Sequence, residues 1–207
     1  MPRSDDQLLE AWRAGDRGAG SELFSRHFRS IHRFFASKVA GANVVEDLVQ
    51  RTFIGAVEGL MRFEGRSSVR TWLYAIARNV LRQWIEARGR ELGRQADPSS
   101  VSVADLGVGP NTAVQLQRER QLLVTGLQRL PLETQTLLEL FYWERLTARQ
   151  LGEVLGLPEG TIRSRLRQAK LELRGVLDEL GKTGAERQSA MVGLETWADE
   201  LRGAFGQ

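Results

Sequence analysis

Cysteine is absent from this chain of 207 residues, and lysine and proline are scarce. Without cysteine the chain can form no disulfide, no thiolate metal site and no cysteine nucleophile. Lysine occurs only at Lys38, Lys170 and Lys182, so arginine supplies nearly all of the positive charge. None of the five prolines lies between Pro2 and Pro98, which leaves a long stretch free of the residue that interrupts helices most strongly.

Long apolar runs are also missing. No stretch approaches the roughly 18 apolar residues of a membrane-spanning helix, and residues 1–10 are acidic and lack the apolar core of a signal peptide. With 42% hydrophobic and 27% charged residues, the composition is not that of a disordered chain. The net charge is only +3. We therefore expect a folded cytoplasmic protein in which charge acts through its location.

The stretch before Pro98 shows the spacing of apolar side chains, three or four residues apart, that is typical of amphipathic helices. Ser4 with Gln7, and Asn43 with Glu46, have the spacing of a capping box. Two helices are therefore expected to begin at Ser4 and Asn43.

Two more helices are expected in this stretch, over 21–39 and from Ser67 or Ser68 to 88. The apolar stripe of the later helix is expected at positions four residues apart: Trp72, Ile76, Val80 and Trp84. The composition then changes, because 93–111 holds two prolines, three glycines and three serines, a mixture typical of a flexible linker. We therefore expect two helical modules joined by a linker.

Residues 147–173, TARQLGEVLGLPEGTIRSRLRQAKLEL, predict two helices separated by a tight turn. Thr147 and Gln150 form a capping box, Gly156 suits a left-handed helix end, and Pro158 fits the first turn of the next helix. The outer face of this second helix carries side chains that can bond bases and phosphates: Arg163, Ser164, Arg167 and Gln168. The pattern favours a helix-turn-helix that reads the major groove over a merely solvated helix.

A second basic segment lies in the first module. Residues 62–90 hold seven arginines and two acids, a local net charge of +5, with two tryptophans among them. Arg78, Asn79 and Arg82 share one side of the expected helix, and the polar loop 63–68 precedes it. Basic side chains beside aromatic ones suit unstacked single strands. The tryptophans themselves have the spacing of core residues, so the loop is the better candidate for a base pocket.

The helix that follows Asn43 has a mixed face. Its polar side carries Asp47, Gln50 and Arg51, with Leu48 and Phe53 at the flanks. Such a face suits contact with another protein, and a solvated helix surface is an equally open interpretation.

Together the two modules resemble the extracytoplasmic-function (ECF) sigma factors of the sigma-70 family. The segment EDLVQRTFIGAVEGLMRFEGRSSVRTWLYAIARN is similar to their region two, and LPLETQTLLELFYWERLTARQLGEVLGLPEGTIRSRLRQAKLELRGVL to their region four. The resemblance implies an all-α fold, in which a region-two helical bundle and a region-four helix-turn-helix are joined by a flexible linker and followed by a C-terminal helix. The expected bounds are 1–91, 92–112, 113–178 and 179–207.

The resemblance also implies a dissociable subunit that binds core RNA polymerase, directs initiation at −35 and −10 elements and helps to melt the −10 element. The residues expected to contact the β′ clamp are Asp47, Leu48, Gln50, Arg51 and Phe53. The residues expected at the −10 element are Arg66, Ser67, Arg78, Asn79 and Arg82, and those at the −35 element are Arg163, Ser164, Arg167 and Gln168. Region four is expected to rest on the β flap near Leu137, Leu140 and Phe141. The sequence departs from the family at Gln83, where an aspartate is usual, and at Glu86, where arginine is common.

The end of the chain, 178–207, is acidic, with six acids and three bases. Its apolar residues follow a short heptad-like seam, and the candidate regulatory residues are Leu194, Trp197, Leu201 and Phe205. Two interpretations are open. The tail packs on a module and restrains DNA or polymerase binding, as an anti-sigma factor would, or it extends the region-four fold.

Two other function classes fit the sequence less well. An enzyme is disfavoured because the only histidines, His27 and His32, do not share a helical face, and no phosphate loop, metal cluster or catalytic triad spacing occurs. We therefore expect no catalytic residue, no cofactor and no metal. A helix-turn-helix regulator that acts on duplex DNA without polymerase is the alternative, and it leaves the mixed face around Asp47 unexplained.

Overall fold

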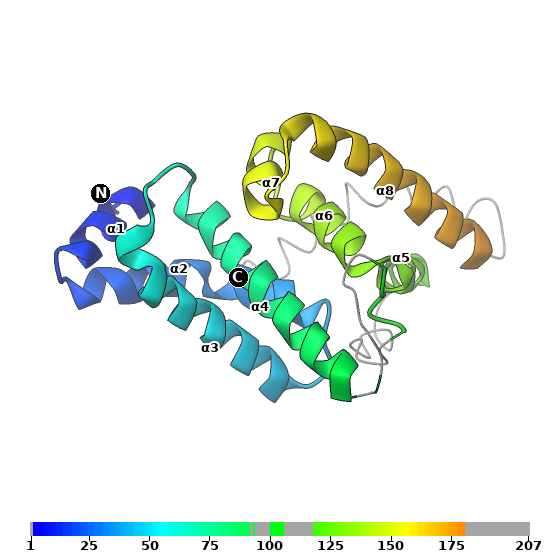
Figure 1. Ribbon diagram of the computed structural model, residues 1–207, viewed down its shortest axis with the longest axis horizontal. Helices are drawn as coiled ribbons and strands as arrows, with labels where there is room; N and C mark the ends of the chain where they lie inside the picture. Colours follow the sequence, from blue (N-terminus) through cyan, green and yellow to red (C-terminus); the bar gives the residue numbers. More distant parts are fainter. Residues whose placement is uncertain (1, 92, 94–99, 106–117, 181–207) are drawn as a thin grey trace.

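The computed structural model describes residues 2–91, 93, 100–105 and 118–180. Within these ranges the helices form two groups that lie side by side (Figure 1). The first group contains α1 (Asp5–Arg13), α2 (Arg17–Ala36), α3 (Ala42–Gly59), the 3-10 turn η1 (Leu60–Arg62) and α4 (Val69–Glu91). The second contains α5 (Arg118–Arg129), α6 (Leu132–Tyr142), α7 (Ala148–Leu155) and α8 (Glu159–Leu180). The tail residues Leu194, Trp197, Leu201 and Phe205 lie outside the described ranges.

Several helices begin at a residue whose side chain caps the first turn. The capping box of α1 is confirmed, because the Gln7 N–H donates to Ser4 Oγ at 3.2 Å and the Ser4 N–H donates to Gln7 Oε1 at 2.8 Å. Ser68 caps α4, where its Oγ accepts the Thr71 N–H at 3.1 Å. The expected start at Asn43 is wrong: α3 begins after Gly41, whose positive φ of 92° turns the chain, and no side chain caps it.

The buried stripe of α4 also differs from the expected one. Of the four expected residues only Val80 is buried, while Trp72, Ile76 and Trp84 are half-buried at the edge of the core. Residues four apart advance about 40° further round the helix at each step, so such a row leaves the core face within three steps. The buried residues instead mix spacings of three and four: Leu73, Ala77, Leu81 and Ile85.

The helix-turn-helix of the second group is confirmed. The Gln150 N–H donates to Thr147 Oγ1 at 3.2 Å, and Gly156 ends α7 with a left-handed φ of 69°. The inner face of α8 is buried at Ile162, Leu166, Ala169 and Leu173. Because this face is held against the other helices of the group, the opposite face of α8 is presented on a fixed support.

The described part of the expected linker is packed. The Leu132 N–H donates to Val101 O at 3.0 Å, an isolated β-bridge joins Ser102 to Pro131, and Val103 is only 1% exposed. Loop composition did not reveal this, because one apolar side chain in a polar segment is enough to anchor it on the α5–α6 corner.

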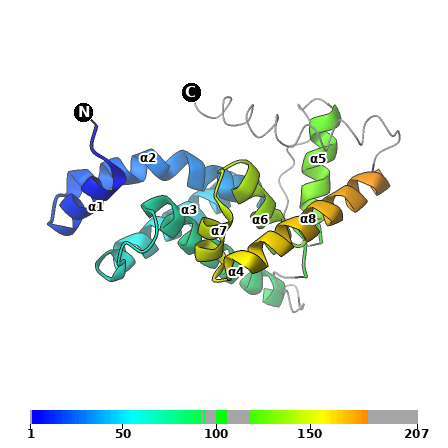
Figure 2. The ribbon, with the colours of Figure 1, turned by 90° about the horizontal axis from the view of Figure 1, so that it is seen from above.

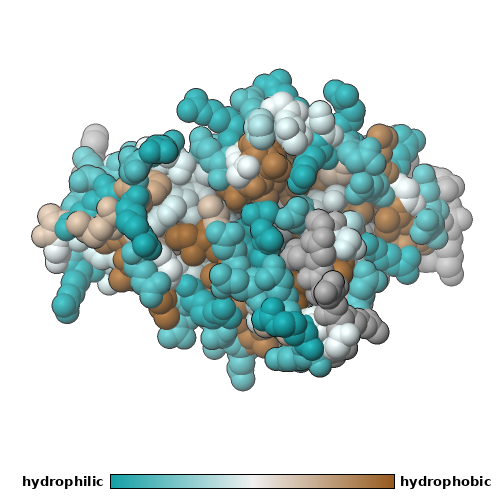
Figure 3. All heavy atoms as spheres, viewed as in Figure 1, coloured by the Kyte–Doolittle hydropathy of each residue, from teal (hydrophilic) through white to brown (hydrophobic). Residues whose placement is uncertain are grey.

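The two groups meet where α4 lies beside α7 (Figures 1 and 2). Hydrophilic side chains cover much of the face shown in Figure 3, with smaller hydrophobic patches between them. Among the helices that the structure describes, none is long and apolar enough to cross a membrane.

Candidate nucleic-acid interface

The outer face of α8 carries the predicted −35 residues. Arg163, Ser164, Arg167 and Gln168 are all exposed, opposite the buried stripe. Arg163 pairs with Glu159 one turn earlier, at 2.6 Å, and Ser164 Oγ donates to the Gly160 carbonyl at 3.3 Å. Guanidinium and amide groups on one rigid helix have the chemistry and the reach to bond base edges in a major groove.

The loop before α4 is tied down by a residue that the sequence analysis missed. Arg13 of α1 donates to the carbonyls of Leu60 and Phe63, and its guanidinium lies 5.9 Å from the centre of the Phe63 ring. Phe63 in turn stacks on Trp72, with ring centres 4.5 Å apart and planes at 21°. No local pattern could reveal Arg13, because its partners lie about fifty residues further along the chain.

A cavity of about 660 Å³ opens beside this loop. Phe63 and Trp72 supply aromatic surface, Arg66 and Ser67 supply polar atoms, and Glu153 reaches the cavity from α7. An unstacked base needs a flat apolar surface and hydrogen-bonding groups at its edges. The predicted −10 residues Arg66 and Ser67 therefore lie at a cavity of suitable chemistry, and half-buried Trp72 belongs to both the core and the cavity wall.

The predicted −10 residues of α4 differ in their exposure. Asn79 is exposed, and Arg82 is partly exposed and lies 3.7 Å from Glu86, the residue that departs from the family pattern. Arg78 has only 14% of its side chain exposed, because it donates to Glu133 of α6 at 2.6 Å. In this arrangement the second group therefore covers part of the predicted −10 face.

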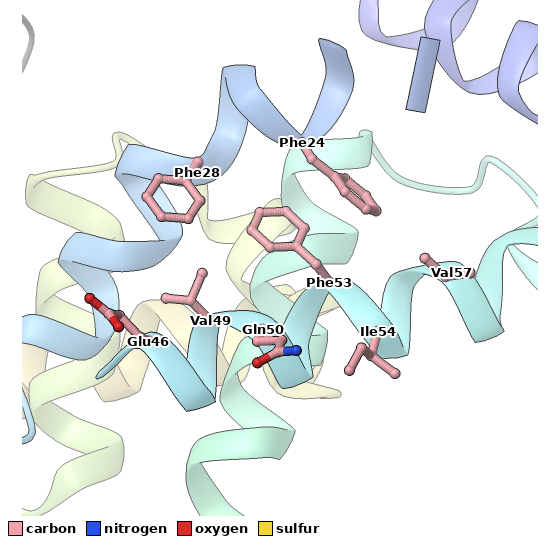
Figure 4. Close-up of a pocket in the computed structure, with 8 residues that line it drawn as sticks. All are labelled: Phe24, Phe28, Glu46, Val49, Gln50, Phe53, Ile54 and Val57. Atoms are coloured by element: carbon pink, nitrogen blue, oxygen red, sulfur yellow. The ribbon is translucent and has the colours of Figure 1, made fainter. Parts of the chain in front are cut away.

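An apolar groove lies between α2 and α3 (Figure 4). Phe24 and Phe28 of α2 face Phe53 of α3, and Ile54 and Val57 continue the apolar surface along α3. Phe28, Ile54 and Val57 are 46%, 48% and 52% exposed. The sequence analysis gave Phe24, Phe28 and Ile54 no role in binding, so the groove was missed.

Of the five predicted clamp-binding residues, only Gln50 and Phe53 line this groove. Asp47 and Gln50 are exposed, Arg51 is half-buried beside Asp47 at 3.8 Å, and Phe53 lines the groove. Leu48 is 0% exposed and packs inside the bundle, so it is corrected to a core residue that offers no contact surface.

The expected flap contact needs a similar correction. Leu137 and Leu140 are 3% and 0% exposed and belong to the core of the second group. Phe141 is half-buried, and the ammonium of Lys170 lies 5.3 Å from its ring centre. Of the three residues, only Phe141 retains accessible surface.

Charged side chains are buried where the two groups meet. Lys38 has no exposed side-chain surface and pairs with Glu139, while Glu144 pairs with Arg33 and Arg70. Burial lowers the pKa of Lys38 below its ordinary value, although Glu139 favours the charged form. Burial opposes ionisation of Glu144, but the combined charges and hydrogen bonds of Arg33, Tyr74 and Arg70 outweigh burial and lower the pKa of Glu144.

Within the described ranges no group of three or more candidate ligands could hold a metal ion. His27 is buried, and its Nε2 lies 2.7 Å from Asp5 Oδ2, a pairing that ties α2 to α1.

Comparison with known families gives two matches, one to each group of helices. Residues 23–91 match the family described as Sigma-70 region 2, and residues 120–173 match Sigma-70, region 4. The matched ranges contain the groove, the loop cavity, α4 and most of α8.

Individual relatives match both groups at once. The ECF RNA polymerase sigma-E factor of Haemophilus influenzae is 30% identical in an alignment of 175 residues, which covers 81% of this chain and 92% of that protein. The ECF RNA polymerase sigma factor SigM of Mycobacterium tuberculosis is 30% identical over 179 residues, which are 86% of this chain and 87% of that protein.

Solved structures show the same fold. CnrH, in complex with the cytosolic domain of CnrY, gives a TM-score of 0.62 at 22% identity over 84% of this chain and 97% of that one. The sigma factor RpoE of Bartonella quintana, in complex with the anti-sigma factor NepR, gives 0.58 at 23% identity over 76% of this chain and 96% of that one.

Proposed function

Since this chain belongs to the ECF group of the sigma-70 family, we propose that its separate faces divide the work of promoter recognition. Its function is that of an RNA polymerase sigma factor, which binds core polymerase and directs initiation at promoters with −35 and −10 elements. It contributes binding rather than catalysis, and it acts in the cytoplasm, where core polymerase works.

The groove between α2 and α3 is the polymerase-binding surface. Exposed apolar side chains such as Phe28, Ile54 and Val57, lying beside polar Glu46 and Gln50, suit a protein partner. The partner is the clamp of the β′ subunit. This groove is the main support for a function that depends on polymerase, because a regulator that acts on duplex DNA alone does not need an exposed protein-binding surface.

The two basic faces bind the promoter. Arg163, Ser164, Arg167 and Gln168 on α8 read the −35 element in the major groove. Arg66 and Ser67 at the loop cavity, with Arg78, Asn79 and Arg82 on α4, bind the −10 element and hold an unstacked base during melting. The pairing of Glu86 with Arg82 leaves Asn79 as the α4 side chain best placed for a base edge.

Further partners are the β flap and an anti-sigma factor. Phe141 is the remaining candidate for the flap contact. Both structural relatives named above were solved with a second protein, and one of these is an anti-sigma factor. An anti-sigma factor, or the acidic tail in its place, would bind where it blocks the groove or a DNA face.

A matched pair of substitutions tests the polymerase surface. Ile54→Ser removes apolar surface from the groove, while Leu171→Ser removes a similar side chain, 57% exposed, from α8. Full burial of an aliphatic side chain stabilises by about 1.5–3 kcal/mol, and about half of Ile54 is still open to be covered, so Ile54→Ser should weaken binding to core polymerase by about tenfold. The affinity of each variant is measured by fluorescence titration of the labelled chain with core polymerase. Equal affinity of the two variants would reject the groove as the polymerase site.

A further inference from the structure

Three glutamates of region four meet basic side chains of region two where the two groups of helices touch. We call these glutamates the acidic row: Glu133 and Glu139 on α6, and Glu144 just after it. Their basic partners come from α2, the residues just after it, and α4: Arg33, Lys38, Arg70 and Arg78. The row spans twelve positions, about 16 Å along a helix, so it is an extended acidic surface and not a single ion pair.

The central contacts of the row are buried. Glu144 has 10% of its side chain exposed and accepts from Arg33 and, at 2.9 Å, from Arg70. Glu139 has 4% exposed, pairs with Lys38 and accepts the Ser37 hydroxyl at 3.0 Å. Removing either partner of such a buried pair leaves an uncompensated charge. The acidic row is therefore a determinant of how region four sits on region two.

The outer contact of the row lies on the predicted −10 face. Glu133 accepts from Arg78 at 2.6 Å and also lies 3.6 Å from Arg165 of α8. The carboxylates here pair with arginine side chains that would otherwise be available to bind DNA phosphates. The row thus presents to region two the same chemistry as a nucleic-acid backbone.

Two further features bear on the competition with DNA: an acid at the loop cavity opposes DNA binding, while two unsatisfied arginine donors favour it. Glu153 of α7 lies at the loop cavity, where its negative charge faces the site proposed for a base. The Nε atoms of Arg78 and Arg82 are buried without a hydrogen-bond partner. An unsatisfied buried donor costs free energy, so a nucleic acid that accepted hydrogen bonds from these two donors would gain free energy on binding.

We propose that the acidic row is a built-in competitor of promoter DNA, which holds region four on region two in the free chain and must leave before the −10 element can bind. This inference rests on the roles proposed above for Arg78 and the loop cavity. If the closed form outnumbers the open form by about ten to one, the free chain binds single-stranded DNA about tenfold more weakly than its open form does.

The first test measures closure without polymerase or DNA. Because the natural chain has no cysteine, Ser25→Cys on α2 and Arg174→Cys on α8, both exposed, accept a fluorophore pair without side reactions. Energy transfer should fall in Arg78→Glu and return in Arg78→Glu with Glu133→Arg, which restores the pair with reversed charges. Transfer that is unchanged in the single variant, or lost equally in the double variant, overturns the proposal.

The second test measures competition. The triple variant Glu133→Gln, Glu139→Gln, Glu144→Gln is compared with Glu10→Gln, Glu58→Gln, Glu179→Gln, which removes the same charge from exposed positions. The probe is a fluorescein-labelled single-stranded DNA of mixed sequence, and circular dichroism checks that both variants are helical. The acidic-row variant should lose energy transfer and bind the probe about tenfold more tightly than its control.

Two results overturn the proposal at this stage. Unchanged energy transfer in the triple variant means that the acidic row does not hold the modules together. Lost transfer with the same probe affinity as the control means that the row holds the modules but does not compete with DNA. Neither readout involves polymerase, so failure of the polymerase-binding groove is detected separately, in the Ile54→Ser titration.

Discussion

Lys38 shows how much a single side chain can depend on residues far along the chain. It follows α2, has no exposed surface, and donates to Glu139, to the Phe34 carbonyl at 3.0 Å and to Ser37 Oγ at 3.1 Å. Its ammonium also lies 4.1 Å from the centre of the Phe34 ring. The charge is therefore tolerated only because each of its donors has a partner.

Lys38→Ala should lower the free energy of unfolding by about 3 kcal/mol, because Glu139 is left buried without its counter-charge. Replacing both residues, as Lys38→Met with Glu139→Leu, should recover most of the loss, since apolar pairs can replace buried ion pairs. The free energies of unfolding of the single and double variants are measured by urea denaturation, monitored by circular dichroism. A double variant as unstable as the single one would show that the pair does not act as a unit.

Glu144 makes the contact between the modules sensitive to acid. Its pKa in the folded chain lies below the ordinary value of 4.5. A carboxyl group with a lowered pKa contributes stability above its unfolded pKa and loses it as the pH falls toward the folded pKa. The melting temperature of the natural chain should therefore exceed that of Glu144→Gln at neutral pH, and the gap should narrow below about pH 4.5. A gap that stays constant down to about pH 3 contradicts this assignment.

At the scale of elements, the sequence predicts what short-range chemistry determines. The capping boxes at Ser4 and Thr147 and the left-handed Gly156 were predictable, because each depends on residues within a few positions. The cap at Asn43 was mispredicted, because Gly41 turns the chain two residues earlier. The buried stripe of α4 was also mispredicted, because residues spaced strictly four apart drift away from the core face of a helix with 3.6 residues per turn.

Gly156 and Gly175 form a matched pair for testing the turn of the helix-turn-helix. A Cβ at either position meets no atom within 4 Å, but only Gly156 has a positive φ, at 69°. Gly156→Ala should lower the free energy of unfolding by about 1 kcal/mol, through backbone strain alone. Gly175→Ala, inside α8, should raise it by about 0.5–1 kcal/mol. Thermal denaturation of the two variants measures these changes in stability. The prediction requires that Gly156→Ala destabilises the chain and that Gly175→Ala stabilises it.

At the scale of the whole molecule, the arrangement depends on contacts that no sequence window contains. Arg33 and Glu144 are 111 residues apart, and Arg13 and Phe63 are 50 apart. The two modules and their functional class could be predicted, because each motif is local. The burial of Leu48 and the covering of Arg78 could not, because both depend on which surfaces meet in three dimensions. The assignment of individual residues to promoter elements and to polymerase stays a prediction.

One measurement tests the central claim most directly, that this chain gives core polymerase its promoter specificity. Core RNA polymerase from the host is incubated with fragments of the host genome, with and without the chain, and the 5′ ends of the transcripts are mapped. Transcripts with defined start sites, preceded by shared −35 and −10 sequences, should appear only when the chain is present, and Arg167→Ala should reduce them strongly. Defined start sites that do not depend on the chain, or tight sequence-specific binding of the chain to duplex DNA without polymerase, would contradict the account.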